Sequence, residues 1–189
     1  IDDDVISHVN NDFVPGIWQA VNYLKELNHR KIAMISAYPR DYRYDDRLGI
    51  FCKAVLNCIP NALLTIIEEK EGFLSNINSG KALTRELLSS GKEFTAVFCT
   101  NDMMAYGCIS ELCKAGLKVP EDVSVIGVDD IICSADFNPP LTTIAFDKQF
   151  QGQRAFEILY NSIKNDEVIN ETIPTKLVIR ESCCPAKNG

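Results

Sequence analysis

Polar and charged residues follow several strand-like apolar runs of this 189-residue sequence. Asp129 and Asp130 come directly after the run "VSVIGV", and Asn101 comes directly after the run "TAVFCT". Arg47 follows a third run, "KIAMIS", at the start of a helical pattern. Arginine, carboxylate and amide groups together can donate to and accept from the hydroxyl groups of a ligand. The residue types therefore predict a binding site for a small polar molecule, with aromatic residues of the adjoining loops beside it.

Alternating helix and strand patterns would bring these residues together. Apolar residues at helical spacing alternate with four short apolar runs, "KIAMIS", "ALLTIIEE", "TAVFCT" and "VSVIGV". This alternation predicts a doubly wound α/β fold, in which helices cover both faces of a parallel sheet. In such a sheet the carboxyl ends of the strands meet at one edge, where ligands bind. We therefore expect the polar groups that follow the strands to share one rim.

Each of these residues also has a purely structural interpretation. Asn101, or its neighbour Asp102, could simply cap the helix that begins there. The pair Asp129–Asp130 could only start a turn, and Arg47 could pair with a neighbouring carboxylate on the surface. The convergence of all of them on one rim favours the binding interpretation.

The pattern changes beyond residue 130. Residues 131–140 have no regular periodicity and end in two prolines. A short strand "LTTIAF", a helix from about Asp147 to Lys164 and a last strand "TKLVIRES" follow. These elements and the first residues of the chain are too few to form a domain alone, so their apolar faces need a partner.

Composition limits the classes of function. The formal net charge of −7 argues against direct binding of nucleic acid, because phosphate contacts need a basic face. No apolar run is long enough to span a bilayer, so we expect no membrane partner. The eight cysteines lack metal-ligand spacing and lie mostly in apolar runs. They indicate buried free thiols in a reducing compartment such as the cytoplasm.

Sequence motifs for catalysis and nucleotide binding are missing. The chain has no nucleophile elbow, no cysteine with a plausible histidine partner and no glycine-rich phosphate loop. We therefore expect a protein that is not an enzyme and needs no metal or cofactor. One enzymatic alternative is a Mg²⁺ site on Asp129 and Asp130, because receiver domains use such a pair. In those domains the pair follows the first strand, whereas here it follows the fourth.

Several segments resemble the effector-binding domain of LacI/GalR-type transcription regulators. The stretch "TAVFCTNDMMAYGCISELCKAGLKVPEDVSVIGVDDI" and the segment "PPLTTI" carry most of the resemblance, and "NHRKIAMIS", "DRLGIFCKAV" and "LVIRES" support it. It runs from about residue 11 to residue 183. The resemblance implies a periplasmic-binding-protein-like fold of type I, in which two lobes enclose a cleft.

The resemblance also implies how the chain divides. Residues 13–139 would form a complete C-terminal lobe. Residues 1–12 and 140–189 would be segments of a partial N-terminal lobe, so the chain would cross between lobes three times. The helix-turn-helix headpiece and most of the N-terminal lobe would lie outside this chain.

Residue by residue, the resemblance assigns ligand contacts to Arg47, Asn101 and Asp129, and it places Phe73 near an aromatic residue that stacks on the ligand. The implied function is effector sensing by a repressor, with a sugar or sugar derivative in the cleft and a nucleobase as a weaker candidate. A homodimer is implied, and operator DNA would be bound only through the absent headpiece. The alternative is a sugar-binding protein of a transport system with the same fold.

Overall fold

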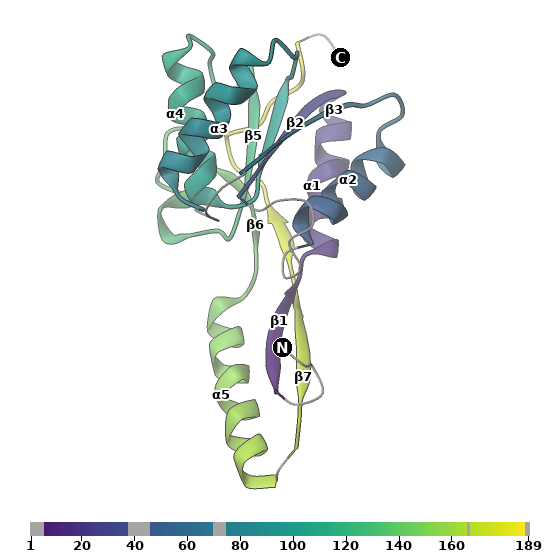
Figure 1. Ribbon diagram of the computed structural model, residues 1–189, viewed down its shortest axis with the longest axis vertical. Helices are drawn as coiled ribbons and strands as arrows, with labels where there is room; N and C mark the ends of the chain where they lie inside the picture. The colour runs from purple at the N-terminus through teal and green to yellow at the C-terminus, as the bar shows by residue number, and fades with distance from the viewer. Residues whose placement is uncertain (1–5, 38–45, 70–74, 166, 188–189) are drawn as a thin grey trace.

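The structure, a computed structural model, describes residues 6–37, 46–69, 75–165 and 167–187. A helix-covered sheet forms the larger part, and an extension of one helix and two strands projects from it (Figure 1). In chain order the elements are β1 (His8–Asp12), α1 (Val14–Glu26), β2 (Lys31–Ser36), α2 (Arg47–Cys58), β3 (Leu63–Glu68), α3 (Ile77–Ser89), β4 (Ala96–Cys99), α4 (Asp102–Lys114), β5 (Ser124–Val128), the short 3-10 helix η1 (Ile132–Ser134), β6 (Thr142–Ala145), α5 (Lys148–Asn165), β7 (Asn170–Pro174) and β8 (Lys176–Val178).

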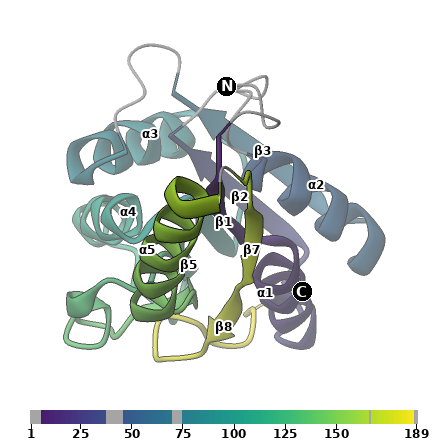
Figure 2. The same ribbon diagram turned by 90° about the horizontal axis from the view of Figure 1, so that it is seen from below.

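Six strands form the main sheet in the order β3-β2-β4-β5-β6-β8. The first five run parallel, and β8 pairs antiparallel with β6. Helices α1 and α2 cover one face of this sheet, and α3 and α4 cover the other (Figures 1 and 2). The predicted doubly wound α/β fold is therefore confirmed.

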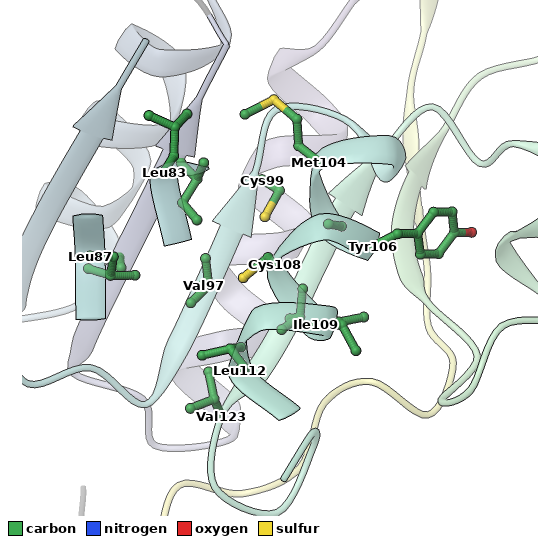
Figure 3. Packing of buried hydrophobic residues seen from close by; sticks show 14 of the residues in the cluster. Leu83, Leu87, Val97, Cys99, Met104, Tyr106, Cys108, Ile109, Leu112 and Val123 are labelled. Atoms are coloured by element: carbon green, nitrogen blue, oxygen red, sulfur yellow. The ribbon is translucent and has the colours of Figure 1, made fainter. Parts of the chain in front are cut away.

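Each face of the sheet has its own buried core. Successive side chains of a strand point to opposite faces. On β2, Ile32 and Met34 therefore pack with α1 and α2, whereas Ala33 and Ile35 pack with α3 and α4. All four are fully buried, which explains why the strand has a continuous apolar sequence. Figure 3 shows the α3–α4 side, where apolar side chains of three elements meet: Leu83 and Leu87 of α3, Val97 of β4 and Leu112 of α4.

All eight cysteines are free thiols, as predicted. Cys99 and Cys108 are buried in the core on the α3–α4 side, where burial raises the pKa of the Cys99 thiol. Cys113 and Cys133 are exposed, so the prediction of burial is wrong for these two. Apolar neighbours in the sequence do not bury a residue on the outer face of a helix.

The division of the chain differs from the prediction. Residues 140–189 were expected to lie outside the lobe that residues 13–139 form. Instead β6 pairs with β5 and β8 pairs with β6, so both strands complete the main sheet and this part of the domain prediction is wrong. The physical reason is burial: all four residues of β6 are buried, as they are in a strand inside a sheet. Among the described elements, β1, α5 and β7 form the extension, apart from the main sheet and the helices that cover it.

The chain passes between the main sheet and the extension three times, at the junctions β1–α1, β6–α5 and β7–β8 (Figure 1). Two of these junctions are bonded together. The Thr175 hydroxyl donates to the carbonyl oxygen of Asp12 at 2.9 Å and accepts from the Gly16 amide at 3.2 Å. Any Cβ on Gly16 would press against the same hydroxyl, so glycine permits this close approach.

Helix α5 presents apolar side chains that the described residues leave uncovered. Only Ile158 of this helix is buried, while Phe156 and Ile163 are 70% and 78% exposed. A hollow of about 330 Å³ lies between β1 and α5, with Ile6 and Val9 in its wall. Among the helices of the described segments, none is long and apolar enough to cross a membrane.

The C-terminal tail is anchored at the amino ends of the strands by His29. Its Nε2 lies 3.0 Å from the carbonyl oxygen of Cys184, and its Nδ1 lies 2.8 Å from the Thr95 hydroxyl. A carbonyl oxygen can only accept, so Nε2 carries the proton and Nδ1 accepts from Thr95 in the neutral ring. Burial lowers the pKa of His29, against the opposing effect of the Cys184 carbonyl. The neutral ring therefore joins the tail to Thr95, the residue directly before β4.

Replacing His29 with alanine should lower the free energy of unfolding by about 1–3 kcal/mol, because buried partners lose their hydrogen bonds. The folded-state pKa of His29 lies below the ordinary value of 6.5, so the unfolded chain binds the proton more tightly. The contribution of His29 to the free energy of unfolding should therefore be fully present above pH 6.5 and should decrease as the pH falls below that value. Denaturant unfolding on both sides of that pH measures the effect. His8→Ala is the control, and an unchanged pH dependence in His29→Ala would contradict the assignment.

Glycines allow α3 and α4 to pack with their backbones in contact. A Cβ on Gly107 of α4 would overlap the carbonyl oxygen of Ile77. Similarly, a Cβ on Gly80 of α3 would overlap the backbone of Met104. Because these neighbours are main-chain atoms, no side-chain rotation can make room, and the two helices must pack as one rigid layer.

Substituting Gly107 with alanine should destabilise the fold by about 1–3 kcal/mol, because the helices must move apart. Gly152→Ala on α5 is the matched control, since nothing lies within 4 Å of the added Cβ. That change should stabilise the helix by up to about 1 kcal/mol through helix propensity. Chemical denaturation of both variants separates the two effects, and equal stability changes would refute the close packing.

Candidate functional site

The carboxyl ends of the parallel strands form a rim that faces the extension (Figure 1). Arg47 is the first residue of α2, Asn101 precedes α4, and Asp129 directly follows β5. The structure thus brings together three of the four residues predicted to contact a ligand. Phe73, the fourth, lies outside the described residues.

Arg47 reaches across the rim instead of lying on the surface. Its Nη1 donates to the carbonyl oxygen of Thr100 at 2.6 Å and lies 4.0 Å from Oδ1 of Asp129. The guanidinium carbon also lies 5.1 Å from the centroid of the Phe13 ring. With only 13% of its side chain exposed, Arg47 does not fit the interpretation as a solvated surface group. It is a positive charge held between the ends of β4 and β5.

Asn101 serves as the N-cap of α4, so its structural interpretation is confirmed. Its Oδ1 accepts from the Met104 amide at 2.8 Å, and its Nδ2 donates to the carbonyl oxygen of Ser75 at 3.2 Å. An amide oxygen has two lone pairs and an amide nitrogen two N–H groups. Each polar atom of Asn101 therefore retains the capacity for one more hydrogen bond, although the residue is only 8% exposed.

Asp129 and Asp130 form a left-handed turn and point to different partners. Their φ angles are 107° and 47°, a region that aspartate enters more readily than most residues. Asp130 forms an ion pair of 2.7 Å with Arg180, whereas the Asp129 carboxylate faces Arg47. Each carboxylate thus lies beside an arginine. This separates their roles, with Asp130 fixing the turn and Asp129 lining the rim.

Behind this turn lies Asp102, whose side chain is fully buried. Its carboxylate accepts from the Ile131 amide at 2.9 Å, the Ser134 hydroxyl at 2.6 Å and the Thr143 hydroxyl. Burial raises the pKa of Asp102, and these three hydrogen bonds oppose the rise. The carboxylate therefore joins the start of α4 to η1 and β6, and so fixes the base of the rim.

The rim has the chemistry of a binding site. Arg47 supplies donors, Asp129 supplies acceptors, and both are partly shielded from water. A ligand that carries hydroxyl or amide groups can satisfy both at once. Within the ranges described above, no three histidine, cysteine, aspartate or glutamate side chains gather in a way that could hold a metal ion.

Three residues that shape the rim were not predicted as such from the sequence. Asp102 was considered only as a helix cap. The threonines of "LTTI" were a detectable sign of a buried acceptor such as Asp102, because hydroxyl groups on a buried strand need hydrogen-bond acceptors. Arg180 interrupts the apolar run "LVIRES", which is also a detectable sign of a partly buried ion pair. Lys148, which contacts the turn from α5, had no local signal because its partners are main-chain carbonyls.

Comparison with known proteins gives a consistent result. Residues 21–183 match the family model described as a periplasmic binding protein-like domain. The HTH-type transcriptional repressor PurR of Histophilus somni is 39% identical over 179 residues, which are 92% of this chain and 51% of that protein. PurR of Vibrio cholerae is 36% identical over 80% of this chain and 44% of its own length. The chain thus spans about half the length of the curated relatives it matches.

Solved structures agree with the sequence comparison. A LacI family transcriptional regulator from Enterococcus faecium with bound ribose has a TM-score of 0.83 and 30% identity, covering 96% of this chain and 66% of that chain. A dimeric Lac repressor has a TM-score of 0.84 and 27% identity, and the match covers 96% of this chain and 65% of that chain. A complex of the regulator CelR with cellobiose has a TM-score of 0.80 and 30% identity, and the match covers 95% of this chain and 54% of that chain. The chain therefore belongs to the periplasmic binding protein-like family, and within it the chain is similar to transcriptional regulators of the LacI type.

Proposed function

We propose that this chain is the effector-sensing part of a LacI-type transcriptional repressor that binds a sugar or sugar derivative at the rim. The observation that carries the proposal is the pair of Arg47 and Asp129, whose nearest charged atoms lie 4.0 Å apart at the ends of neighbouring strands. This separation is longer than a hydrogen bond, so a ligand hydroxyl can accept from one group and donate to the other.

Two further residues complete the proposed contact set. Asn101 offers one more acceptor site and one more N–H beyond its capping bonds, which suits a pair of neighbouring hydroxyl groups. Phe73 would supply a flat apolar surface for one face of the ligand. The similar structures with bound ribose and with cellobiose support a sugar as the ligand class.

The proposed output is a change in DNA binding elsewhere in the protein. Effector binding would favour one arrangement of the extension relative to the main sheet, a population shift between two states. Operator DNA would be bound by a helix-turn-helix headpiece outside this chain, which fits the formal net charge of −7. The repressors among the relatives favour this function over a transport protein of the same fold.

A homodimer is part of the same proposal. Ile132 on η1 is 96% exposed, and Met103 in the first turn of the neighbouring helix α4 is 37% exposed. Asp102 of α4 accepts hydrogen bonds from Ile131 and from Ser134 of η1, so the two elements are held together. Exposed apolar side chains of this kind suit a contact with a second copy of the chain. The similar Lac repressor structure is dimeric, which supports this assignment.

A thermal-shift experiment on the intact protein tests the proposal. Ribose, cellobiose and a set of nucleobases are added in turn, and ribose or cellobiose at a hundredfold excess over Kd should stabilise the fold by about 3 kcal/mol. Arg47→Ala and Asp129→Ala should each weaken that sugar's affinity at least about tenfold, because a charge-assisted hydrogen bond is lost.

The matched control is Arg85→Ala on α3, since Arg85 is 60% exposed and pairs with Glu111 away from the rim. It should bind the sugar like the parent protein. Parent-like sugar affinity in Arg47→Ala and Asp129→Ala would refute the site. Stabilisation by a nucleobase alone would replace the sugar assignment with a heteroaromatic one.

A further inference from the structure

The turn that presents Asp129 is held in a conformation that costs free energy. Asp129 and Asp130 have φ angles of 107° and 47°, so two consecutive residues other than glycine are left-handed. This conformation is unfavourable for a residue with a Cβ, because the Cβ comes too close to the neighbouring carbonyl oxygen. Surrounding contacts must offset this cost, because the turn would otherwise relax to an ordinary backbone conformation.

Most of those contacts come from the main sheet. The Asp129 amide donates to the carbonyl oxygen of Ile144 at 2.8 Å. Asp130 pairs with Arg180, and the Ile131 amide donates to Asp102. These bonds all lie within the six-stranded unit, so they fix the turn relative to the sheet but not relative to the extension.

Lys148 is the exception, because it belongs to the extension. It is the first residue of α5, directly after the chain leaves β6. Its Nζ donates to the carbonyl oxygens of both Asp129 and Asp130, the latter at 3.1 Å. The ammonium also lies 4.6 Å from the centroid of the Phe146 ring, at the same junction. A single side chain of α5 thus holds the two carbonyls of the turn.

We propose that Lys148 is a positioning residue that links the effector-binding turn to the extension. The inference rests on the proposed function, in which Asp129 binds the effector. An effector bound to the Asp129 carboxylate changes the left-handed backbone, and the two carbonyls change direction with it. Because Lys148 holds both carbonyls from the first turn of α5, the helix follows. Lys148 thereby converts a local change at the rim into a movement of α5.

The chemistry of lysine suits this role. An ammonium group has three donors, so it can hold two carbonyls and still bond to water. Its four-carbon stem lets the ammonium group reach both carbonyls of the turn from the first residue of α5. One such bond has a net worth of about 1 kcal/mol, which is enough for about a fivefold change in an opening equilibrium.

Hydrogen exchange in the intact protein tests this role, with Lys148→Gln compared with Lys164→Gln. Lys164 lies in the last turn of the same helix, so it controls for loss of a charge on α5. Without ligand, Lys148→Gln should speed exchange about fivefold at the amides of Asp129 and Ile131 and at the Gln151 amide of α5. Lys164→Gln should leave the exchange rates of these amides unchanged. Lys148→Arg should keep most of the protection that the parent protein shows, because it retains a positively charged donor.

The second arm uses ribose as the probe. In the parent protein, ribose should slow exchange at the turn and in the first turns of α5. In Lys148→Gln, it should slow exchange at the turn alone. The proposal would be overturned if ribose slowed exchange in α5 equally in both proteins. It would also be overturned if ligand-free Lys148→Gln exchanged at the same rates as the parent protein. Absence of ribose protection in the parent would count against the sugar function, while the ligand-free comparison would still decide the role of Lys148.

Discussion

A buried carboxylate organises the end of the molecule where ligands would bind. An unpaired charge cannot remain inside a protein, so the fully buried Asp102 requires donors from every element around it. It takes them from η1, from β6 and from the backbone after β5. The start of α4, the turn at Asp129 and the strand β6 are therefore fixed relative to one another by one side chain. The geometry of the rim follows from that requirement.

The charged residues of the rim differ in how closely their partners hold them. Asp102 and Asp130 are taken up by structural partners, in one case hydroxyl and amide groups and in the other Arg180. Arg47 and Asp129 face each other at 4.0 Å, a longer distance than the 2.7 Å between Asp130 and Arg180. Membership of the family and the similar sugar complexes fit a site of this kind, in which few polar groups select a hydroxylated ligand.

The sequence was most informative where the physics is local. Periodicity predicted strands β2 to β5 and the helices beside them, and the rule for strand ends placed Arg47 and Asp129 on one rim. It failed where pairing is distant in the chain. Strand β7 was not predicted, because only Ile173 of its five residues is buried and its pairing with β1 is between backbones. The same limit hid Lys148, whose partners are carbonyls that any residue carries.

The joined junctions at Asp12 and Thr175 restrict how the extension can move. The junction before Lys148 lies beside them, because Ala145 at the end of β6 pairs with Lys176 at the start of β8. The three connections between the main sheet and the extension are therefore close together. A change in the length of any one of them would tilt the extension relative to the sheet, because the other two would stay in place.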